Sequence, residues 1–173
     1  MRLKDKVAVV SGIAHGIGKE TALRFAREGA RVIGCDINED AARETAKEAE
    51  AAGAPLAAVQ IVDMFREDAV KDFMGGVGKE FGRIDILVNS AAVVEFGWID
   101  EMPLEAFRKT LIGEVDSVFI ACQAAWPHLK QSGAAAVVNF ASIAAHGAVG
   151  ALPQVAHAAG KGAVLSMTRQ LAL

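Results

Sequence analysis

The chain has 173 residues, of which 53% are hydrophobic, and its formal net charge is −3. A chain of this length and composition can bury a sizeable core, so we expect a single domain over residues 1–173. The charges are dispersed, which argues against nucleic acid or a membrane as partner and favours a small-molecule substrate. There is no signal-like N-terminal core and no apolar stretch long enough to span a bilayer, so we expect a cytoplasmic protein.

A glycine-rich turn follows the first strand-like run of the sequence. The run Val7–Val10 is apolar, and glycines 12, 16 and 18 lead directly into a helical pattern. Such glycines let the backbone approach an anion closely, while the first N–H groups of the helix face it. On this pattern alone, a plain tight turn is about as probable as a phosphate site. Asp36 favours the phosphate site, because it ends a second strand-like run where dinucleotide folds place the carboxylate that binds the adenine ribose.

Strand-like and helical patterns alternate through the rest of the chain. We expect further strands at 31–35, 56–62, 84–89 and 134–141, one long helix over about 104–131, a loop over 142–153 and a last helix over 154–173. The mostly unbroken apolar strands suit a parallel sheet covered on both faces. The sequence therefore predicts an α/β fold, a doubly wound Rossmann-type sheet with strand order 3-2-1-4-5.

Ligands of such sheets bind beyond the carboxyl ends of the strands. The glycine turn, Asp36, Asp63 and Asn89 each follow or end a predicted strand, so we expect them to lie along this edge of the sheet. The two cysteines, Cys35 and Cys122, lie in apolar runs without metal-ligand spacing, and we expect both to be reduced and packed. We expect no metal site and no disulfide.

These motifs together resemble the short-chain dehydrogenase/reductase family over residues 6–173. Segment 11–18 is similar to the cofactor turn of the family, segment 83–92 to its central strand with an Asn-Asn-Ala-Gly motif, and Asp63-Met64 to the pair that holds the adenine ring. The resemblance implies an oxidoreductase that oxidises an alcohol or reduces a ketone with NAD. The cofactor-binding positions that it implies are Ser11, Gly12, His15, Gly16, Ile17, Gly18, Asp36, Ile37, Asp63, Met64, Asn89, Ala91 and Lys161.

The choice between NAD and NADP depends on Asp36 and His15. A carboxylate at Asp36 would repel the 2′-phosphate of NADP. His15 lies where many NADP-dependent members of the family carry a basic residue. We expect the carboxylate to decide, so that NAD is preferred.

The catalytic motif departs from the family pattern, which combines a Tyr-x-x-x-Lys helix with a serine and an asparagine. This chain has no tyrosine, and His157 stands one helical turn before Lys161 on the same helix face. Ser142 aligns with the serine of the family, and Glu114 aligns with its asparagine. The catalytic positions implied by the resemblance are Ser142, His157, Lys161 and Glu114.

His157 and Glu114 each allow two interpretations. An imidazole can give and take a proton near neutral pH, so His157 can replace the tyrosine; alternatively, it packs on an apolar helix with a satisfied hydrogen bond. Glu114 is either an exposed helix carboxylate or a partner that compensates the charge of Lys161, which lies in a charge-poor segment. The chain is accordingly either an NAD-dependent oxidoreductase or an NAD-binding protein that has lost turnover and serves a binding or scaffolding role.

Members of this family usually continue beyond the helix of the catalytic lysine. The resemblance therefore predicts a chain that is incomplete at its C-terminus and lacks the further C-terminal strands. It also implies a homodimer or homotetramer formed through the helices around 104–131 and 154–173, since the family commonly pairs its subunits there.

Overall fold

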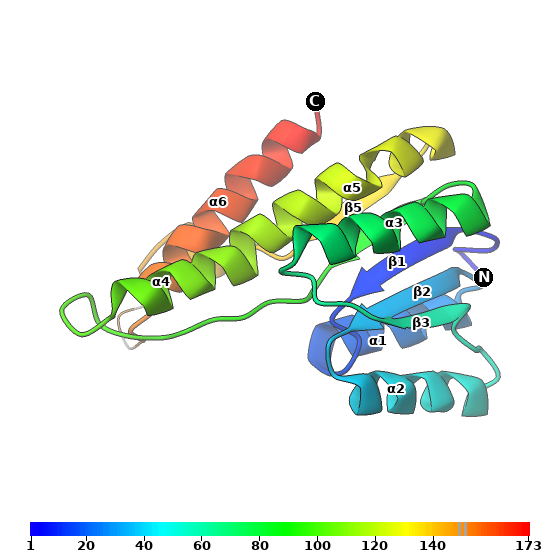
Figure 1. Cartoon of the computed structure of the whole chain (residues 1–173), viewed down its shortest axis with the longest axis horizontal. Helices are drawn as coiled ribbons and strands as arrows, with labels where there is room; N and C mark the ends of the chain where they lie inside the picture. The colour runs from blue at the N-terminus through cyan, green and yellow to red at the C-terminus, as the bar shows by residue number, and fades with distance from the viewer. Residues whose placement is uncertain (149, 151) are drawn as a thin grey trace. The chain divides into compact units, whose positions relative to one another are not determined.

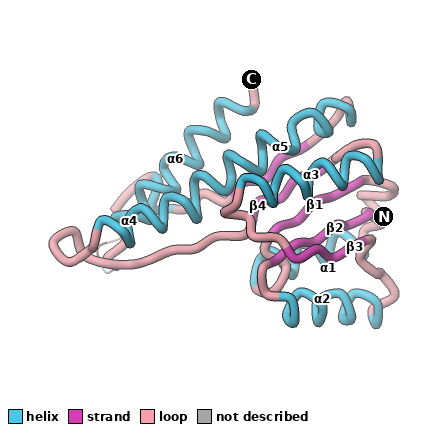
Figure 2. The backbone as a smooth tube through the Cα atoms, in the orientation of Figure 1, coloured by secondary structure: helices cyan, strands magenta, loops and turns pink. Residues whose placement is uncertain are grey.

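The chain folds into two compact units in the computed structural model, which describes residues 1–148, 150 and 152–173. Unit 1 comprises residues 1–91 and 120–138, and unit 2 comprises residues 92–119 and 139–173. Figure 1 labels the helices and strands, and Figure 2 shows the loops between them. The expectation of one cofactor-binding domain over the whole chain stays a prediction.

A parallel sheet forms the centre of unit 1. Its strands are β1 (Val7–Ser11), β2 (Arg31–Asp36), β3 (Ala58–Ile61), β4 (Ile86–Asn89) and β5 (Ala136–Asn139). The spatial order is β3-β2-β1-β4-β5, and β1 pairs in parallel with both β2 and β4. Every residue of β1 is buried, as expected for a central strand covered on both faces. The predicted doubly wound sheet with order 3-2-1-4-5 is confirmed.

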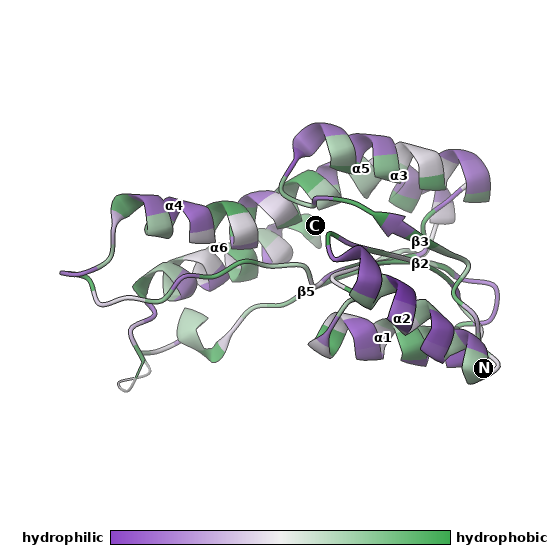
Figure 3. Ribbon diagram, turned by 60° about the horizontal axis from the view of Figure 1, so that its bottom comes forward, coloured by the Kyte–Doolittle hydropathy of each residue, from purple (hydrophilic) through white to green (hydrophobic). Residues whose placement is uncertain are grey.

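Helices cover both faces of this sheet. On one face, α1 (Gly16–Arg27) contacts β1 and β2, and α2 (Glu39–Ala51) contacts β2 and β3. On the other face lie α3 (Glu67–Phe81) and α5 (Ser117–Ser132), as Figure 3 shows. The side chain of Asn38 caps α2 by accepting a hydrogen bond from the Ala41 N–H. Because the strands run parallel, the loops that follow their carboxyl ends lie along one edge of the sheet.

The long helix predicted over 104–131 is interrupted. The structure has α4 (Leu104–Leu111), a π-helical segment η1 (Ile112–Asp116) and then α5. Each extra residue in a π-helical turn rotates the following residues by about 100° relative to a regular helix. A regular helix over 104–131 would place Phe119 in its apolar stripe and Glu114 at the border of that stripe. In the structure Phe119 is instead 51% exposed, and Glu114 is buried, with 2% exposed.

Unit 2 is organised around α6 (Val155–Leu171). This helix packs against α4, against η1 and against a short 3₁₀ helix, η2 (Ile143–Ala145), which forms within the predicted loop 142–153. Gly97, in the loop that precedes α4, pairs with Gln154 and donates a backbone hydrogen bond to Pro153. The loop before α4 thus holds the start of α6, although the two segments are distant in sequence. Within the described residues, no helix is both long and apolar enough to cross a membrane.

Candidate active site

The glycine turn of unit 1 is held against the segment that follows β4. The Ser11 hydroxyl accepts hydrogen bonds from the N–H groups of Ser90 and Ala91, at 3.1 and 3.2 Å. Gly12 has a φ of +75°, and a Cβ placed on it would lie 2.8 Å from the Ala91 nitrogen. Both the dihedral angle and the close approach therefore require glycine at this position.

The N-terminus of α1 faces open space. α1 begins at Gly16, which has a φ of +56°, and nothing lies within 4 Å of the place that a Cβ would occupy there. The His15 side chain is exposed and caps no N–H group of the helix. The first-turn amides and the positive end of the helix dipole are thus available to an anion.

Both oxygens of the Asp36 carboxylate are engaged by the backbone. The Ala14 N–H donates to Oδ2 and the Asn38 N–H donates to Oδ1, each at 2.9 Å. The side chain is half-buried at the carboxyl end of β2, and the neighbouring Ile37 is exposed. The position of the negative charge next to the glycine turn is therefore fixed by two hydrogen bonds.

The remaining predicted cofactor positions in unit 1 differ in accessibility. Asp63 is half-buried and accepts a hydrogen bond from the Phe65 N–H. The Met64 side chain is buried, and its Sδ lies 3.6 Å from Cys35 Sγ, so only the backbone of Met64 is left for a ligand. Asn89 is buried, and its Nδ2 lies 3.5 Å from Cys122 Sγ. Cys35 is a free buried thiol, and burial raises its pKa far above the usual value, which makes it unreactive.

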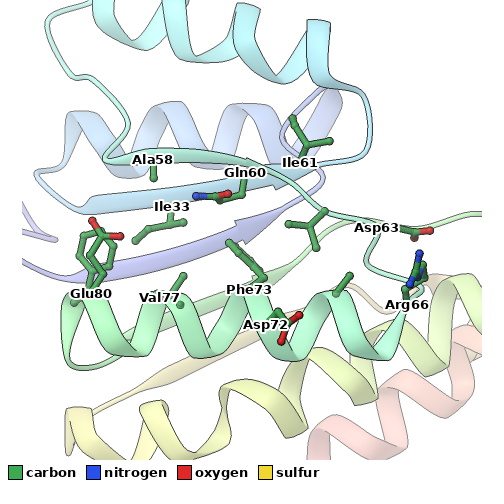
Figure 4. Close-up of a pocket in the computed structure, with 14 residues that line it drawn as sticks. Ile33, Ala58, Gln60, Ile61, Asp63, Arg66, Asp72, Phe73, Val77 and Glu80 are labelled. Atoms are coloured by element: carbon green, nitrogen blue, oxygen red, sulfur yellow. The ribbon is translucent and has the colours of Figure 1, made fainter.

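A recess of about 550 Å³ lies between β3 and α3 (Figure 4). Ile33, Phe73 and Val77 form part of its apolar lining, and Asp72 and Glu80 belong to its polar lining. Asp63 is the only predicted site residue that lines it. This recess therefore runs along the edge of the sheet and does not coincide with the glycine turn.

Three of the four predicted catalytic side chains meet in unit 2. Glu114 Oε1 lies 2.7 Å from His157 Nδ1 and 3.5 Å from Lys161 Nζ. The π-helical segment directs the carboxylate into the packing between η1 and α6, where His157 and Lys161 lie one helical turn apart. Lys161 is buried, so the carboxylate compensates a charge that would be costly to bury alone. Of the two interpretations of Glu114, the structure shows the buried partner of Lys161 and not an exposed carboxylate.

Ser142 lies outside this cluster of contacts. It caps η2, since its hydroxyl accepts a hydrogen bond from the Ala144 N–H at 3.2 Å. η2 in turn packs against α6, which carries His157 and Lys161. The hydroxyl is half-buried and keeps its own proton available for donation.

The sequence does not identify two features near His157, the aromatic ring of Phe96 and a recess that begins beside this ring. The Phe96 ring lies 6.1 Å from the imidazole, centroid to centroid, and is tilted by 59°. Gly97 follows Phe96 in the sequence, and Ala158 follows His157. Both line a recess of about 330 Å³. Its other walls are almost entirely apolar, and among the described lining residues only Gln154 has a polar side chain apart from the indole of Trp98.

Comparison with known proteins decides the family. The model of the short chain dehydrogenase family matches residues 6–173. The chain belongs to the short-chain dehydrogenase family. It is 37% identical over 175 residues to D-threitol dehydrogenase from Mycolicibacterium smegmatis, and 34% identical over 173 residues to 2-(R)-hydroxypropyl-CoM dehydrogenase from Xanthobacter autotrophicus.

A solved dehydrogenase structure has the same fold. The structure of 7α-hydroxysteroid dehydrogenase in complex with NADH and 7-oxo glycochenodeoxycholic acid superposes with a TM-score of 0.91 at 30% identity, over 99% of this chain and 66% of that one. The match with D-threitol dehydrogenase likewise covers 99% of this chain and 65% of the relative, and the match with the Xanthobacter enzyme covers 98% and 68%. The chain thus spans about two thirds of the length of these dehydrogenases.

Proposed function

We propose that this short-chain dehydrogenase is an NAD-dependent oxidoreductase that interconverts an alcohol and a ketone, with His157 as the group that moves the proton. The observation that carries the proposal is the imidazole one helical turn before Lys161, whose Nδ1 is engaged by the buried Glu114 carboxylate. An imidazole held in this way is suited to acid–base chemistry near neutral pH.

The residues of unit 1 fit a dinucleotide. The open space at Gly16 and the free amides of the first turn of α1 suit a pyrophosphate. The exposed side chains of Ile17 and Ile37 offer apolar surface near the turn and β2. The fixed Asp36 carboxylate would accept hydrogen bonds from ribose hydroxyls and repel a 2′-phosphate, which favours NAD over NADP.

The residues of unit 2 would handle the proton. Bound NAD supplies the hydride acceptor for alcohol oxidation, or NADH the donor for ketone reduction. In oxidation, His157 Nε2 accepts the hydroxyl proton of the alcohol, and Ser142 donates a hydrogen bond to the substrate oxygen. In reduction, the imidazolium returns that proton to the oxygen. Lys161 contributes a positive charge near His157 and, in this proposal, binds the cofactor ribose.

The recess at Gly97 and Ala158 favours a substrate with an apolar body. Its lining offers few partners for hydroxyl or charged groups, and burying such groups there without a partner would be unfavourable. We therefore propose a secondary alcohol or ketone with an apolar body as the substrate class.

We further propose self-association through 104–131 and 154–173, where Phe119 exposes an aromatic ring.

An NADH-linked assay tests the proposed function. The purified chain is incubated with NAD and a panel of secondary alcohols that ranges from apolar alcohols to polyols, and NADH formation is followed by absorbance. We expect turnover with apolar alcohols that exceeds turnover with polyols. Binding of NADH without turnover of any alcohol or ketone would support the alternative of a catalytically impaired NAD-binding protein.

A further inference from the structure

The tautomer of a neutral histidine is determined by the partner of each ring nitrogen. A carboxylate can only accept hydrogen bonds, so a neutral imidazole that contacts one must place its proton on the nitrogen that faces it. In this chain the facing nitrogen is His157 Nδ1, at 2.7 Å from Glu114 Oε1. The contact therefore leaves Nε2 with a lone pair, which is the form that a base requires.

The Glu114 carboxylate is itself held in place. The side chain is 2% exposed, and Oε1 also faces Lys161 Nζ at 3.5 Å. No hydrogen-bond donor of the described residues reaches the other oxygen, Oε2. An unpaired buried carboxylate oxygen is costly, and it persists here because the surrounding chain fixes the side chain.

Gly160 provides the space that Oε2 occupies. A Cβ built on Gly160 would lie 2.6 Å from Glu114 Oε2, which is closer than real side-chain contacts allow. Gly160 lies inside α6, where glycine is an unfavourable residue and no left-handed dihedral angle requires it. Among the described residues, only the Glu114 side chain lies close enough to explain a glycine at this position of α6.

We propose that Glu114 is a positioning residue that fixes the tautomer and orientation of His157, and that Gly160 is required because it leaves room for the carboxylate. The consequence for the rate rests on the function proposed above, whereas the assignment of the tautomer does not. Phe96 packs on the imidazole and further restricts its rotation. Glu114, Gly160 and His157 thus act as one unit.

Nuclear magnetic resonance of the ring nitrogens tests the proposal without any turnover. With ¹⁵N-labelled histidine, the signals of His157 are assigned by their absence in His157→Ala. At a pH where the ring is neutral, we expect Nδ1 to be protonated and Nε2 to be unprotonated. The opposite tautomer, or an even mixture of both, in the unmodified protein would overturn the assignment.

Two glycine substitutions on the same helix provide a matched comparison. Gly160→Ala should displace the carboxylate and reduce the preference for the Nδ1–H tautomer. Gly162→Ala should leave that preference unchanged, since nothing lies within 4 Å of its Cβ position. Both changes raise helix propensity equally, so the difference between them reports the contact with Glu114. An unchanged tautomer in a folded Gly160→Ala would contradict the role of Gly160.

A substitution of Glu114 itself covers the case in which Gly160→Ala does not fold. Glu114→Met keeps a similar length without an acceptor, and the tautomer preference should disappear. If the unmodified chain turns over, kcat should fall at least about tenfold in Gly160→Ala and remain near its original value in Gly162→Ala. The expected tautomer without any turnover would refute the proposed function alone, and turnover with the opposite tautomer would refute the positioning role alone.

Discussion

Glu114 Oε1 lies 2.7 Å from His157 Nδ1, although 43 residues separate them in the sequence. The contact arises because a π-helical segment carries Glu114 into the packing against α6. π-Helical segments are rare and occur frequently at functional sites. In this chain the segment supplies a carboxylate to a histidine and a lysine, so the catalytic role of the histidine is the first prediction to test.

Replacement of His157 by alanine should lower turnover and spare cofactor binding. A general acid/base group contributes about 10²–10⁴-fold to a rate, so kcat of His157→Ala should fall by roughly this factor. The dissociation constant of NADH should stay within about twofold, because the residues proposed to hold the dinucleotide lie mainly in unit 1. His146→Ala is the matched control, since His146 is exposed on a loop outside the proposed machinery. Undiminished turnover in His157→Ala would remove the imidazole from the mechanism.

Asp36 should determine the choice of cofactor. Fluorescence titration of the unmodified protein should show tighter binding of NADH than of NADPH. Asp36→Ala should reduce this preference, because it removes the charge that repels a 2′-phosphate. Asp40→Ala, an exposed change in the first turn of α2, should leave it intact. Tighter binding of NADPH by the unmodified protein would show that His15 and not Asp36 sets the preference.

Asp85 should stabilise the fold in a manner that depends on pH. Its buried carboxylate accepts hydrogen bonds from Ser132 Oγ, the Val7 N–H and Arg83 Nε. Burial by itself would raise the pKa of Asp85, but these hydrogen bonds outweigh it and hold the pKa below its usual value. The stabilisation is therefore fully present above the unfolded pKa of about 3.9, and it is lost as the pH falls through the lower folded value.

Urea unfolding measures this contribution. Asp85→Asn should lower the free energy of unfolding by about 1–3 kcal/mol at neutral pH, and the difference from the unmodified protein should shrink in acid. Asp68→Asn should have no measurable effect, since Asp68 pairs with Arg66 on the surface. A loss in Asp85→Asn that is independent of pH would assign the effect to packing and not to the charge.

Phe119 should contribute to self-association. Its ring is about half exposed in the segment that is proposed to pair subunits. Phe119→Glu should shift sedimentation velocity profiles towards the monomer, whereas Ile61→Glu, a change on an exposed residue of β3, should not. An unmodified protein that sediments as a monomer at all concentrations would contradict the proposed assembly.

The sheet order was predictable because its signals are local. Apolar runs and the glycine turn each depend on a few neighbouring residues, and both appear as expected. The strand bounds are less precise: the third strand was predicted over 56–62, and β3 covers Ala58–Ile61. Ends of strands depend on pairing with neighbours, which the local sequence does not contain.

The environment of Glu114 was only partly predictable. Pairing with Lys161 is one of the two interpretations that the sequence leaves open, since a lysine in a charge-poor segment is costly to bury alone, and the structure shows the pair. Its contact with His157 does not follow from the sequence, because the periodicity over 104–131 predicts a regular helix. The π-helical segment packs against α6, and helical periodicity alone places Glu114 only at the border of the apolar stripe.

The two backbone hydrogen bonds to Asp36 connect cofactor preference with the shape of the glycine turn. The carboxylate that would meet the ribose also tethers the Ala14 amide of the turn and the Asn38 amide that leads into α2. A substitution such as Asp36→Ala removes both acceptors together with the charge, so it would release both amides and loosen the turn. If Asp36 sets the cofactor preference as proposed, a variant that prefers NADP needs a residue that replaces those two acceptors as well as one that binds the extra phosphate.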